Sequence, residues 1–304
     1  MDEVGLSFET ARPILVRKGP SAMPRAEVPL FSILTVTLNG GDGLCRTVAS
    51  VDEQEHGDYE HLVKDGGSLD GSLERVPGSS RRRVVTAPDS GIYDAMNQAL
   101  AMSRGRFVLF LNAGDVLATP TALRAAAEAL RAAPETELLY CDYFSEERGA
   151  VVASPPALSE FFLYRTMLCH QSYLCRSDVY RRLGGFDTSF RIAADYEFLA
   201  RAVLRGGVRS RYAPLLLARY QGGGFSTRRD SVLRLRQEVR AVRARHLPRS
   251  KRLVFGAMYA LTLPSLRGRL ASHPGLGRVY TGIVNGYYKV AALATKRDRL
   301  GDAR

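Results

Sequence analysis

The sequence predicts an α/β fold in which a mostly parallel central sheet is flanked by helices. Three observations predict it: apolar, β-branched runs alternate with helical patterns, the connections between them are short, and the first four expected strands end in polar stretches. Alternating strands and helices are typical of βαβ units, whose strands run parallel. Ligands bind beyond the carboxyl ends of such strands, so the polar stretches form the expected binding edge.

The first half of the chain supplies most of this pattern. Its expected strands are 31–38, 60–65, 82–86, 106–111 and 137–144. Its expected helices are 42–54, 91–103 and 119–133. In the second of these helices, Ile92, Met96 and Leu100 fall on one stripe, as an amphipathic helix requires. The second half is less regular, with expected helices at 176–187, 193–207 and 228–247, a strand at 214–220 and a glycine-rich loop at 221–227.

Composition and charge divide the chain. Its 304 residues are 45% hydrophobic and 24% charged, which is typical of globular proteins. Residues 227–304 hold 18 Lys and Arg against 4 Asp and Glu, a net of +14, so the remaining residues carry −2 of the total of +12. We therefore expect a leader at 1–27, a catalytic or binding body at 28–226 and a basic α-helical region at 227–304.

Several common sites and segments are not expected. The N-terminal residues lack the apolar core of a secretory signal, and no run of about 18 apolar residues predicts a transmembrane helix. The four cysteines lack a CxxC pair and favour reduced thiols in the cytoplasm, and the five histidines lack zinc-ligand spacing. Neither a GxGxxG motif, a phosphate-binding P-loop nor a GxSxG elbow is present.

The loop VKDGGSLDGS, residues 63–72, is the most informative of the four polar strand ends. Asp65 stands where its carboxylate could accept hydrogen bonds from a nucleotide base or ribose, and Gly66 and Gly67 would let the backbone approach a ligand closely. The alternative is an ordinary turn, because Asp-Gly and Gly-Ser are turn-forming pairs. Taken alone, the loop does not decide between these.

The chain resembles family 2 glycosyltransferases, which have the GT-A fold. The matching segments occur in the family's order over residues 31–226: FSILTVTLN (31–39), VKDGGSLDGS (63–72), PDSGIYDAMNQAL (88–100), FVLFLNAGD (107–115), CHQSYL (169–174), LGGFD (183–187) and AADYEF (193–198). The segments SGIYDAMN and LNAGD resemble bacterial transferases of exopolysaccharide, capsule and O-antigen assembly. The resemblance implies an inverting glycosyltransferase that moves a sugar from a nucleotide-diphosphate sugar to a saccharide or polyprenyl-lipid-linked acceptor.

The resemblance also implies a donor site at the strand ends. Its expected residues are Thr37 and Asn39 against the base, Asp65 in contact with the base, Asp89 and Asn97 along the diphosphate-sugar pocket, and Asn112 in the turn after the fourth strand. That turn is richer in acid in many members, where it holds Mg²⁺ or Mn²⁺. Here Asp115 remains as the expected metal-facing acid, and one carboxylate suffices where phosphate oxygens and water complete the shell. The alternative is that Asp115 only caps the turn.

Asp195 matches the family's catalytic base, which takes the proton of the acceptor hydroxyl. The alternative is an acid that only complements the helix dipole. Glu197 is its nearest competitor, but the two acids point in different directions from a helix, so one of them is expected to face the pocket. His170 and Gln171 are expected near the donor sugar and acceptor, and Ser226 in a loop that closes over the donor. For Tyr93 and Asp94 the resemblance implies no definite role.

The basic region permits three interpretations. Its mixture of Arg, Tyr and apolar residues suits an interfacial helix on an anionic membrane, which would place the enzyme on the inner face of the plasma membrane near a lipid-linked acceptor. It could instead form a helical subdomain packed on the body. Nucleic acid is the least favoured partner, because no nucleic-acid motif accompanies the charge. A competing hypothesis for the whole chain is a non-catalytic assembly protein of the same fold, docked to a membrane by this region.

Overall fold

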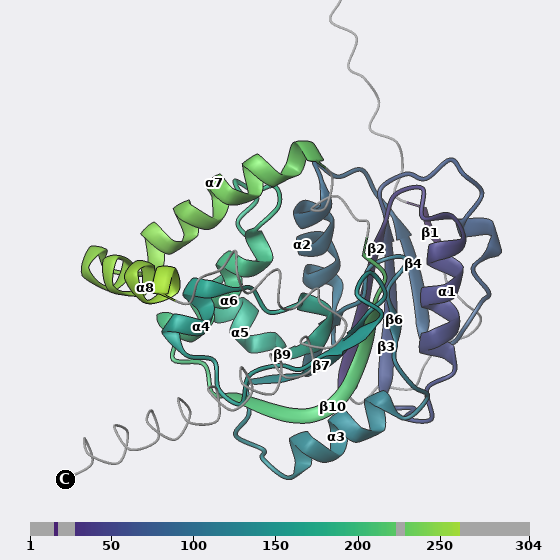
Figure 1. The fold of residues 1–304 in the computed structure, drawn as a ribbon. Coiled ribbons are helices and arrows are strands. Elements are labelled where there is room, and N and C mark those ends of the chain that lie inside the picture. The colour runs from purple at the N-terminus through teal and green to yellow at the C-terminus, as the bar shows by residue number, and fades with distance from the viewer. Residues whose placement is uncertain (1–14, 18–27, 223–228, 262–304) are drawn as a thin grey trace, which may run out of the picture.

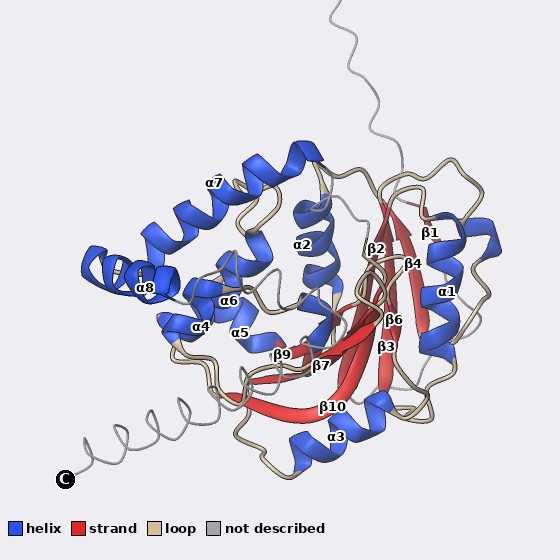
Figure 2. Cartoon of the chain, viewed as in Figure 1, coloured by secondary structure: helices blue, strands red, loops and turns tan. Residues whose placement is uncertain are grey.

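The structure, a computed structural model, describes residues 15–17, 28–222 and 229–261. Ser226 lies outside the described residues, as do residues 262–304 and the rest of the expected leader. The predictions made for those segments therefore stay predictions. The helices and strands of the described residues are shown in Figures 1 and 2.

One sheet organises the described residues. Its strands are β1 (Leu15–Arg17), β2 (Phe31–Thr37), β3 (Tyr59–Asp65), β4 (Arg82–Thr86), β5 (Phe107–Phe110), β6 (Val116–Leu117), β7 (Leu138–Ser145), β8 (Ala150–Val152), β9 (Tyr173–Arg176) and β10 (Ser210–Tyr220). They lie in the order β1-β4-β3-β2-β5-β9-β7-β10-β6, and β8 pairs with β7.

Eight α-helices accompany the sheet within the described residues. They are α1 (Gly41–Asp52), α2 (Ile92–Met102), α3 (Ala122–Arg131), α4 (Glu160–Arg165), α5 (Ser177–Leu183), α6 (Ala194–Leu204), α7 (Arg229–His246) and α8 (Arg249–Leu261). Two short 3₁₀ helices, η1 (Leu73–Arg75) and η2 (His170–Ser172), complete the elements. The predicted helices and strands are thus confirmed in type, with shorter bounds at several ends.

The expected parallel sheet is confirmed in its first half. Strands β4, β3, β2 and β5 run parallel to one another, and β2 pairs with β3 on one side and β5 on the other. The chain therefore runs outward from β2 through β3 and β4, then returns to β5 across β2. Strand order reverses at that point, and in open α/β sheets ligands bind outside the carboxyl ends of the strands at such a reversal.

The sheet is buried on both faces. All seven residues of β2 are buried, as expected for a central parallel strand covered by helices on both sides. Leu34 packs with α2, α5 and α6 on one face, whereas Ile33, the preceding residue, packs with α3 on the other. Figure 1 shows the two helical layers, with α1 and α2 on opposite sides of the sheet.

The second half of the sheet departs from the simple prediction. Strand β9 runs antiparallel to both β5 and β7, so the sheet is mixed there. The sequence CHQSYLC was not predicted as a strand, because β9 has only four residues and starts directly after η2. The position of β9 between β5 and β7 matters for the site, because it brings η2 to the carboxyl end of β5.

Two segments outside the expected body pack on it. Strand β1, in the expected leader, pairs antiparallel with β4, with Val16 opposite Val85. Helix α7 buries Val242, and the Phe255 ring of α8 packs at a tilt against the rings of Phe161 and Tyr164 of α4. Figure 1 shows α7 and α8 on the outer side of the α4–α6 layer. Among the described helices, none has both the length and the apolar character needed to cross a membrane.

Candidate active site

The loop after β3 is organised by Asp65. Its carboxylate accepts hydrogen bonds from the backbone N–H groups of Gly67 at 2.8 Å and Ser68 at 3.1 Å, and from the Ser68 hydroxyl. The residue is fully buried. Asp65 therefore shapes the loop in which the sequence places it, and a contact with a nucleotide base stays a prediction.

Asn39 ties the end of β2 to the same loop. Its backbone N–H donates to Ser68 Oγ at 2.7 Å, and its Oδ1 accepts from the Leu69 N–H at 3.0 Å. Asn39 has φ of +53°, the left-handed region that Asn tolerates better than most side chains. The predicted base-binding residues Asn39 and Asp65 thus lie at adjoining loops of one edge.

The side-chain oxygen of the neighbouring Thr37 forms no hydrogen bond with the described residues. This oxygen, Oγ1, is buried. A Cβ at Gly40 would lie 2.4 Å from this oxygen, so only glycine lets the chain pass so close. An orphaned buried hydroxyl costs free energy unless a ligand or water satisfies it, which is consistent with the predicted ligand site.

Asp89 is paired with a lysine that the sequence analysis did not single out. Lys64 is fully buried in β3, and its Nζ forms an ion pair with Asp89 and donates to the Ala87 carbonyl at 2.8 Å. The Asp89 side chain is 12% exposed, and its Oδ1 accepts from the Gly91 N–H. The available signal was a lysine directly after the apolar pair Leu62–Val63 of a predicted buried strand, because a buried cation requires a partner.

Asn97 does not line a pocket with its amide. Its Nδ2 donates to the Phe186 carbonyl at 2.9 Å, and its Oδ1 accepts from the Phe186 N–H at 2.8 Å. Both ends of the amide are therefore occupied by the backbone of the LGGFD segment. Asn97 therefore fastens α2 to the loop after α5, and a contact with the diphosphate sugar stays a prediction.

His170 joins two sequence motifs that lie far apart in the chain. Its Nε2 lies 3.1 Å from Asn112 Nδ2, in the turn after β5, and its Nδ1 lies 3.0 Å from Asp195 Oδ2, in the first turn of α6. An Nδ1–H donating to Asp195 and an Nε2 accepting from Asn112 satisfy both contacts. The structure thus brings together three predicted site residues.

Asp195 is held on both oxygens yet remains open to solvent. Its Oδ1 accepts from the Tyr196 N–H at 2.8 Å and lies 3.0 Å from Tyr93 Oη, and its side chain is 21% exposed. Burial alone would raise the pKa of Asp195, but the bond and charge of His170, with Tyr196 and Tyr93, lower it below the usual value. Asp195 is therefore a carboxylate at neutral pH.

Tyr93 and Asp94, whose roles were open, have different surroundings. The Tyr93 hydroxyl lies 2.6 Å from the Ile192 carbonyl besides contacting Asp195, and burial raises its pKa well above the usual value. It therefore stays a neutral donor that positions the start of α6. Asp94 accepts from the Ser90 N–H at 2.8 Å and caps the start of α2.

Asp115 is buried beside η2. Its Oδ2 accepts from Gln171 Nε2 at 2.6 Å, and its Oδ1 accepts from the Gln221 N–H at 3.1 Å. Burial raises the pKa of Asp115, although the Gln171 hydrogen bond opposes that rise. Gln171 thus contacts the predicted metal-facing acid, and Gln221 brings the start of the glycine-rich loop to the same place.

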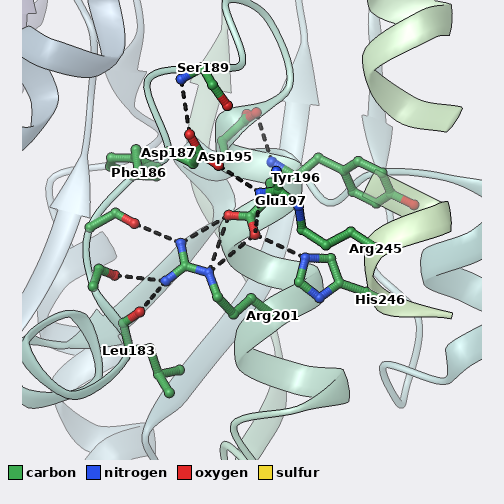
Figure 3. A network of polar contacts seen from close by, with 12 residues as sticks. Leu183, Phe186, Asp187, Ser189, Asp195, Tyr196, Glu197, Arg201, Arg245 and His246 are labelled. Atoms are coloured by element: carbon green, nitrogen blue, oxygen red, sulfur yellow. Dashed lines mark hydrogen bonds and ion pairs between the residues drawn. The ribbon is translucent and has the colours of Figure 1, made fainter. Parts of the chain in front are cut away.

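Glu197 lies apart from this group. Figure 3 shows it among Arg201, Arg245 and His246, with Asp195 pointing elsewhere. Glu197 Oε2 lies 2.9 Å from Arg201, its Oε1 lies 2.9 Å from His246 Nε2, and the residue is 1% exposed. Of the two competing acids, Glu197 is therefore the one that the structure turns away from His170, and a pocket role for it stays a prediction. The reason is helix geometry, which turns this side chain toward α7.

Comparisons with known proteins relate the chain to a family. The sequence profile of glycosyl transferase family 2 matches residues 32–161. An uncharacterized glycosyltransferase of Mycobacterium tuberculosis is 36% identical over 185 residues, which cover 58% of this chain and 70% of the relative. A PGL/p-HBAD biosynthesis glycosyltransferase of the same species is 29% identical over 204 residues, covering 65% and 79%.

Solved structures agree on the fold. TarS 1–349 of S. aureus in complex with UDP-GlcNAc has a TM-score of 0.55 at 18% identity and covers 70% of this chain and 66% of that one. The mannosyltransferase PcManGT from Pyrobaculum calidifontis, in complex with GDP-Man and Mn²⁺, has a TM-score of 0.55 at 18% identity and covers 95% and 92%. The chain therefore belongs to glycosyl transferase family 2 and is a glycosyltransferase with the GT-A fold.

Proposed function

We propose that this glycosyltransferase is an inverting enzyme that transfers a sugar from a nucleotide-diphosphate sugar to a saccharide or lipid-linked acceptor in surface polysaccharide biosynthesis. One observation carries the proposal: Asp195, the predicted base, is joined through His170 to Asn112 in the turn after β5. This supports a base that lies next to one of the predicted donor loops. The UDP-GlcNAc and GDP-Man in complexes of TarS and PcManGT support a nucleotide sugar as donor here.

In this proposal Asp195 acts as general base. Its carboxylate takes the proton from an acceptor hydroxyl while that oxygen attacks the anomeric carbon, and the nucleoside diphosphate leaves from the opposite face. His170 and Tyr93 hold the carboxylate in position, since each contacts a different oxygen. The low pKa of Asp195 keeps it ionised and ready to accept the proton.

The residues near the turn fit a divalent cation that the donor diphosphate brings with it. Asn112 Oδ1 is buried without a partner in the described residues, and Asp115 supplies a carboxylate, so both groups are the hard oxygen donors that Mg²⁺ and Mn²⁺ prefer. The described ranges contain no cluster of three or more His, Cys, Asp or Glu that could hold a metal alone. When bound, the cation would neutralise charge on the leaving diphosphate.

Membrane association also remains a proposal. Residues 229–261 pack on the body through α7 and α8, so the basic region contributes at least a helical layer there. Attachment of residues 262–304 to an anionic leaflet would bring the site near a lipid-linked acceptor. The distribution of charge supports this, because the net basicity of the chain lies beyond residue 226.

The test measures donor binding and stereochemistry together. Calorimetry with UDP-, GDP- and dTDP-sugars, with and without Mn²⁺, should find one nucleotide that binds, and Mn²⁺ should bind tightly only in its presence. Proton NMR of the product should then show the anomeric configuration opposite to that of the donor. Retention of configuration would contradict the inverting mechanism, and tight Mn²⁺ binding to the free chain would contradict the donor-completed metal site.

A further inference from the structure

A pocket lies between α4, α6 and α7. It has a volume of about 390 Å³ and is formed by the end of α4 with the residues after it, the start of α6 and one face of α7. That volume is within the range of small-molecule sites. Two of its lining segments adjoin residues of the proposed site in sequence, because Thr166 and Met167 come shortly before His170 and Tyr196 directly follows Asp195.

The polar part of this pocket is strongly cationic. Four arginines line it, and no Asp or Glu does: Arg165, Arg236, Arg240 and Arg243. Arg236, Arg240 and Arg243 follow an i, i+4, i+7 spacing and share one face of α7. In the described part of the chain, Arg236 and Arg240 have no ion-pair partner, although seventeen other pairs are formed there.

One arginine of the group is held in place by two tyrosines. The guanidinium of Arg243 lies 4.5 Å from the centroid of the Tyr164 ring and is hydrogen-bonded to Tyr196, and Arg243 Nε is buried without a hydrogen-bond partner within the described ranges. A guanidinium has five N–H donors, so others remain to bind an anion. A guanidinium so placed is suited to phosphate oxygens, which accept two parallel hydrogen bonds from it.

The remaining wall is apolar. Met167, Leu235 and Val239 line the pocket, and Met167 is 41% exposed although it is a large hydrophobic residue. A free inorganic anion would use the arginines and leave this wall in water. A ligand with an anionic group joined to a hydrocarbon chain would use both, because burial of apolar surface adds favourable free energy.

We infer that this pocket binds the phosphate or diphosphate of an acceptor that carries an apolar chain. The arginines would hold the phosphate groups, and Met167, Leu235 and Val239 would contact the first part of the chain. The inference deepens the proposed function, on which it rests, by naming the acceptor class. It also gives the unpaired arginines of α7 a specific task close to Asp195.

The experiment compares two probes on matched variants. Calorimetry with farnesyl diphosphate and with inorganic pyrophosphate is carried out in saturating UDP or GDP with Mn²⁺, so that the donor site is filled. The wild type should bind farnesyl diphosphate about tenfold more tightly than pyrophosphate, a difference of about 1.4 kcal/mol. The double variant Arg236→Glu/Arg240→Glu should lose at least about tenfold in affinity for both probes.

Two further variants distinguish binding in the pocket from a general effect of the positive charge of α7. Arg234→Glu reverses a charge on the same helix outside the pocket and should leave both affinities within about twofold of the wild type. Met167→Gln should weaken farnesyl diphosphate toward the affinity of pyrophosphate. The inference would be overturned if the double variant bound both probes as tightly as the wild type does. It would also be overturned if Arg234→Glu weakened binding as much as the double variant does, or if the wild type did not prefer farnesyl diphosphate to pyrophosphate.

The outcome also distinguishes this inference from the proposed function. Farnesyl diphosphate binding that depends on Arg236 and Arg240, in a chain that binds no nucleotide sugar, would retain the pocket and reject the donor assignment. Nucleotide binding without arginine-dependent binding of the prenyl probe would retain the transferase and reject the pocket. Thermal unfolding of each variant shows whether a loss of affinity comes from a loss of structure.

Discussion

Helix α6 carries two carboxylate–histidine pairs that start only two residues apart. Asp195 Oδ2 lies 3.0 Å from His170 Nδ1, and Glu197 Oε1 lies 2.9 Å from His246 Nε2. The side chains of the first pair are 21% and 17% exposed, whereas those of the second are 2% and 3% exposed. The same two residue types thus form one open pair and one closed pair.

The difference comes from helix geometry and from the partners that complete each pair. Residues two apart on a helix point about 200° away from one another, so Asp195 and Glu197 must face different surroundings. Glu197 also holds Arg201, which in turn donates to the backbone carbonyls of residues 183–185. The closed pair therefore ties α6 to its neighbours, whereas the open pair keeps a carboxylate where a substrate could reach it.

The largest expected effect is the loss of transfer in Asp195→Asn. The amide has the shape of the carboxylate but accepts a proton poorly, so we expect kcat to fall by about 10³-fold. The free energy of unfolding and the affinity for the nucleotide should change little. Transfer assays and urea unfolding check this, and a variant with kcat within tenfold of the wild type would remove Asp195 as the base.

The matched substitution in the closed pair, Glu197→Gln, should act on stability. Removing the charge opposite Arg201 and His246 leaves a buried cation without its partner, and we expect the free energy of unfolding to fall by about 3 kcal/mol. Urea unfolding measures it, with the exposed acid variant Glu128→Gln as control. A stable Glu197→Gln variant without activity would reverse the roles assigned to the two acids.

The loss of stability in Glu197→Gln should depend on pH. Burial would raise the pKa of Glu197, but the bonds to His246 and Arg201 lower it below the usual value. The stabilisation is therefore present above the pKa of the unfolded state and is lost as pH falls through the folded value. The difference in stability between the wild type and Glu197→Gln should shrink as the pH is lowered.

A smaller effect is expected at Asn97. This substitution tests whether a predicted donor residue contributes to stability, as Glu197 does, rather than to transfer, as Asp195 does. Asn97→Ala removes both hydrogen bonds to the Phe186 backbone and should lower the free energy of unfolding by about 2 kcal/mol. Nucleotide affinity should stay near that of the wild type. Gln98→Ala, at the next residue, serves as control, and a selective loss of nucleotide binding in Asn97→Ala would support the original prediction.

The smallest expected effect concerns the acid limb of the pH profile. His170→Ala removes the hydrogen bond and the charge that lower the pKa of Asp195, so that pKa should rise. The enzyme would then lose its ionised base at a higher pH than the wild type does. The pH dependence of kcat/KM measures this, and an unchanged acid limb would show that His170 does not act through Asp195.

Sequence reasoning predicted the strand and helix types of the parallel half well, because β2 and β5 are apolar runs with polar ends. It missed β9, whose four residues are too short to show a period. The motif resemblance placed Asp195, His170 and Asn112 in one site, and the structure brings these three together. Sequence reasoning also predicted that Asp195 and Glu197 point apart, and the structure turns Glu197 into a buried network with Arg201 and His246.

The sequence by itself determined the family, the α/β class and the candidates for chemistry, because hydrophobic period and motif spacing are local properties of the chain. Only the tertiary structure decided which candidates are free to act. Phe186 takes both ends of the Asn97 amide, and Arg201 and the distant His246 take the Glu197 carboxylate, whereas Asp195 keeps part of its carboxylate exposed. Whether a polar group is satisfied depends on neighbours that chain folding alone brings within hydrogen-bond distance.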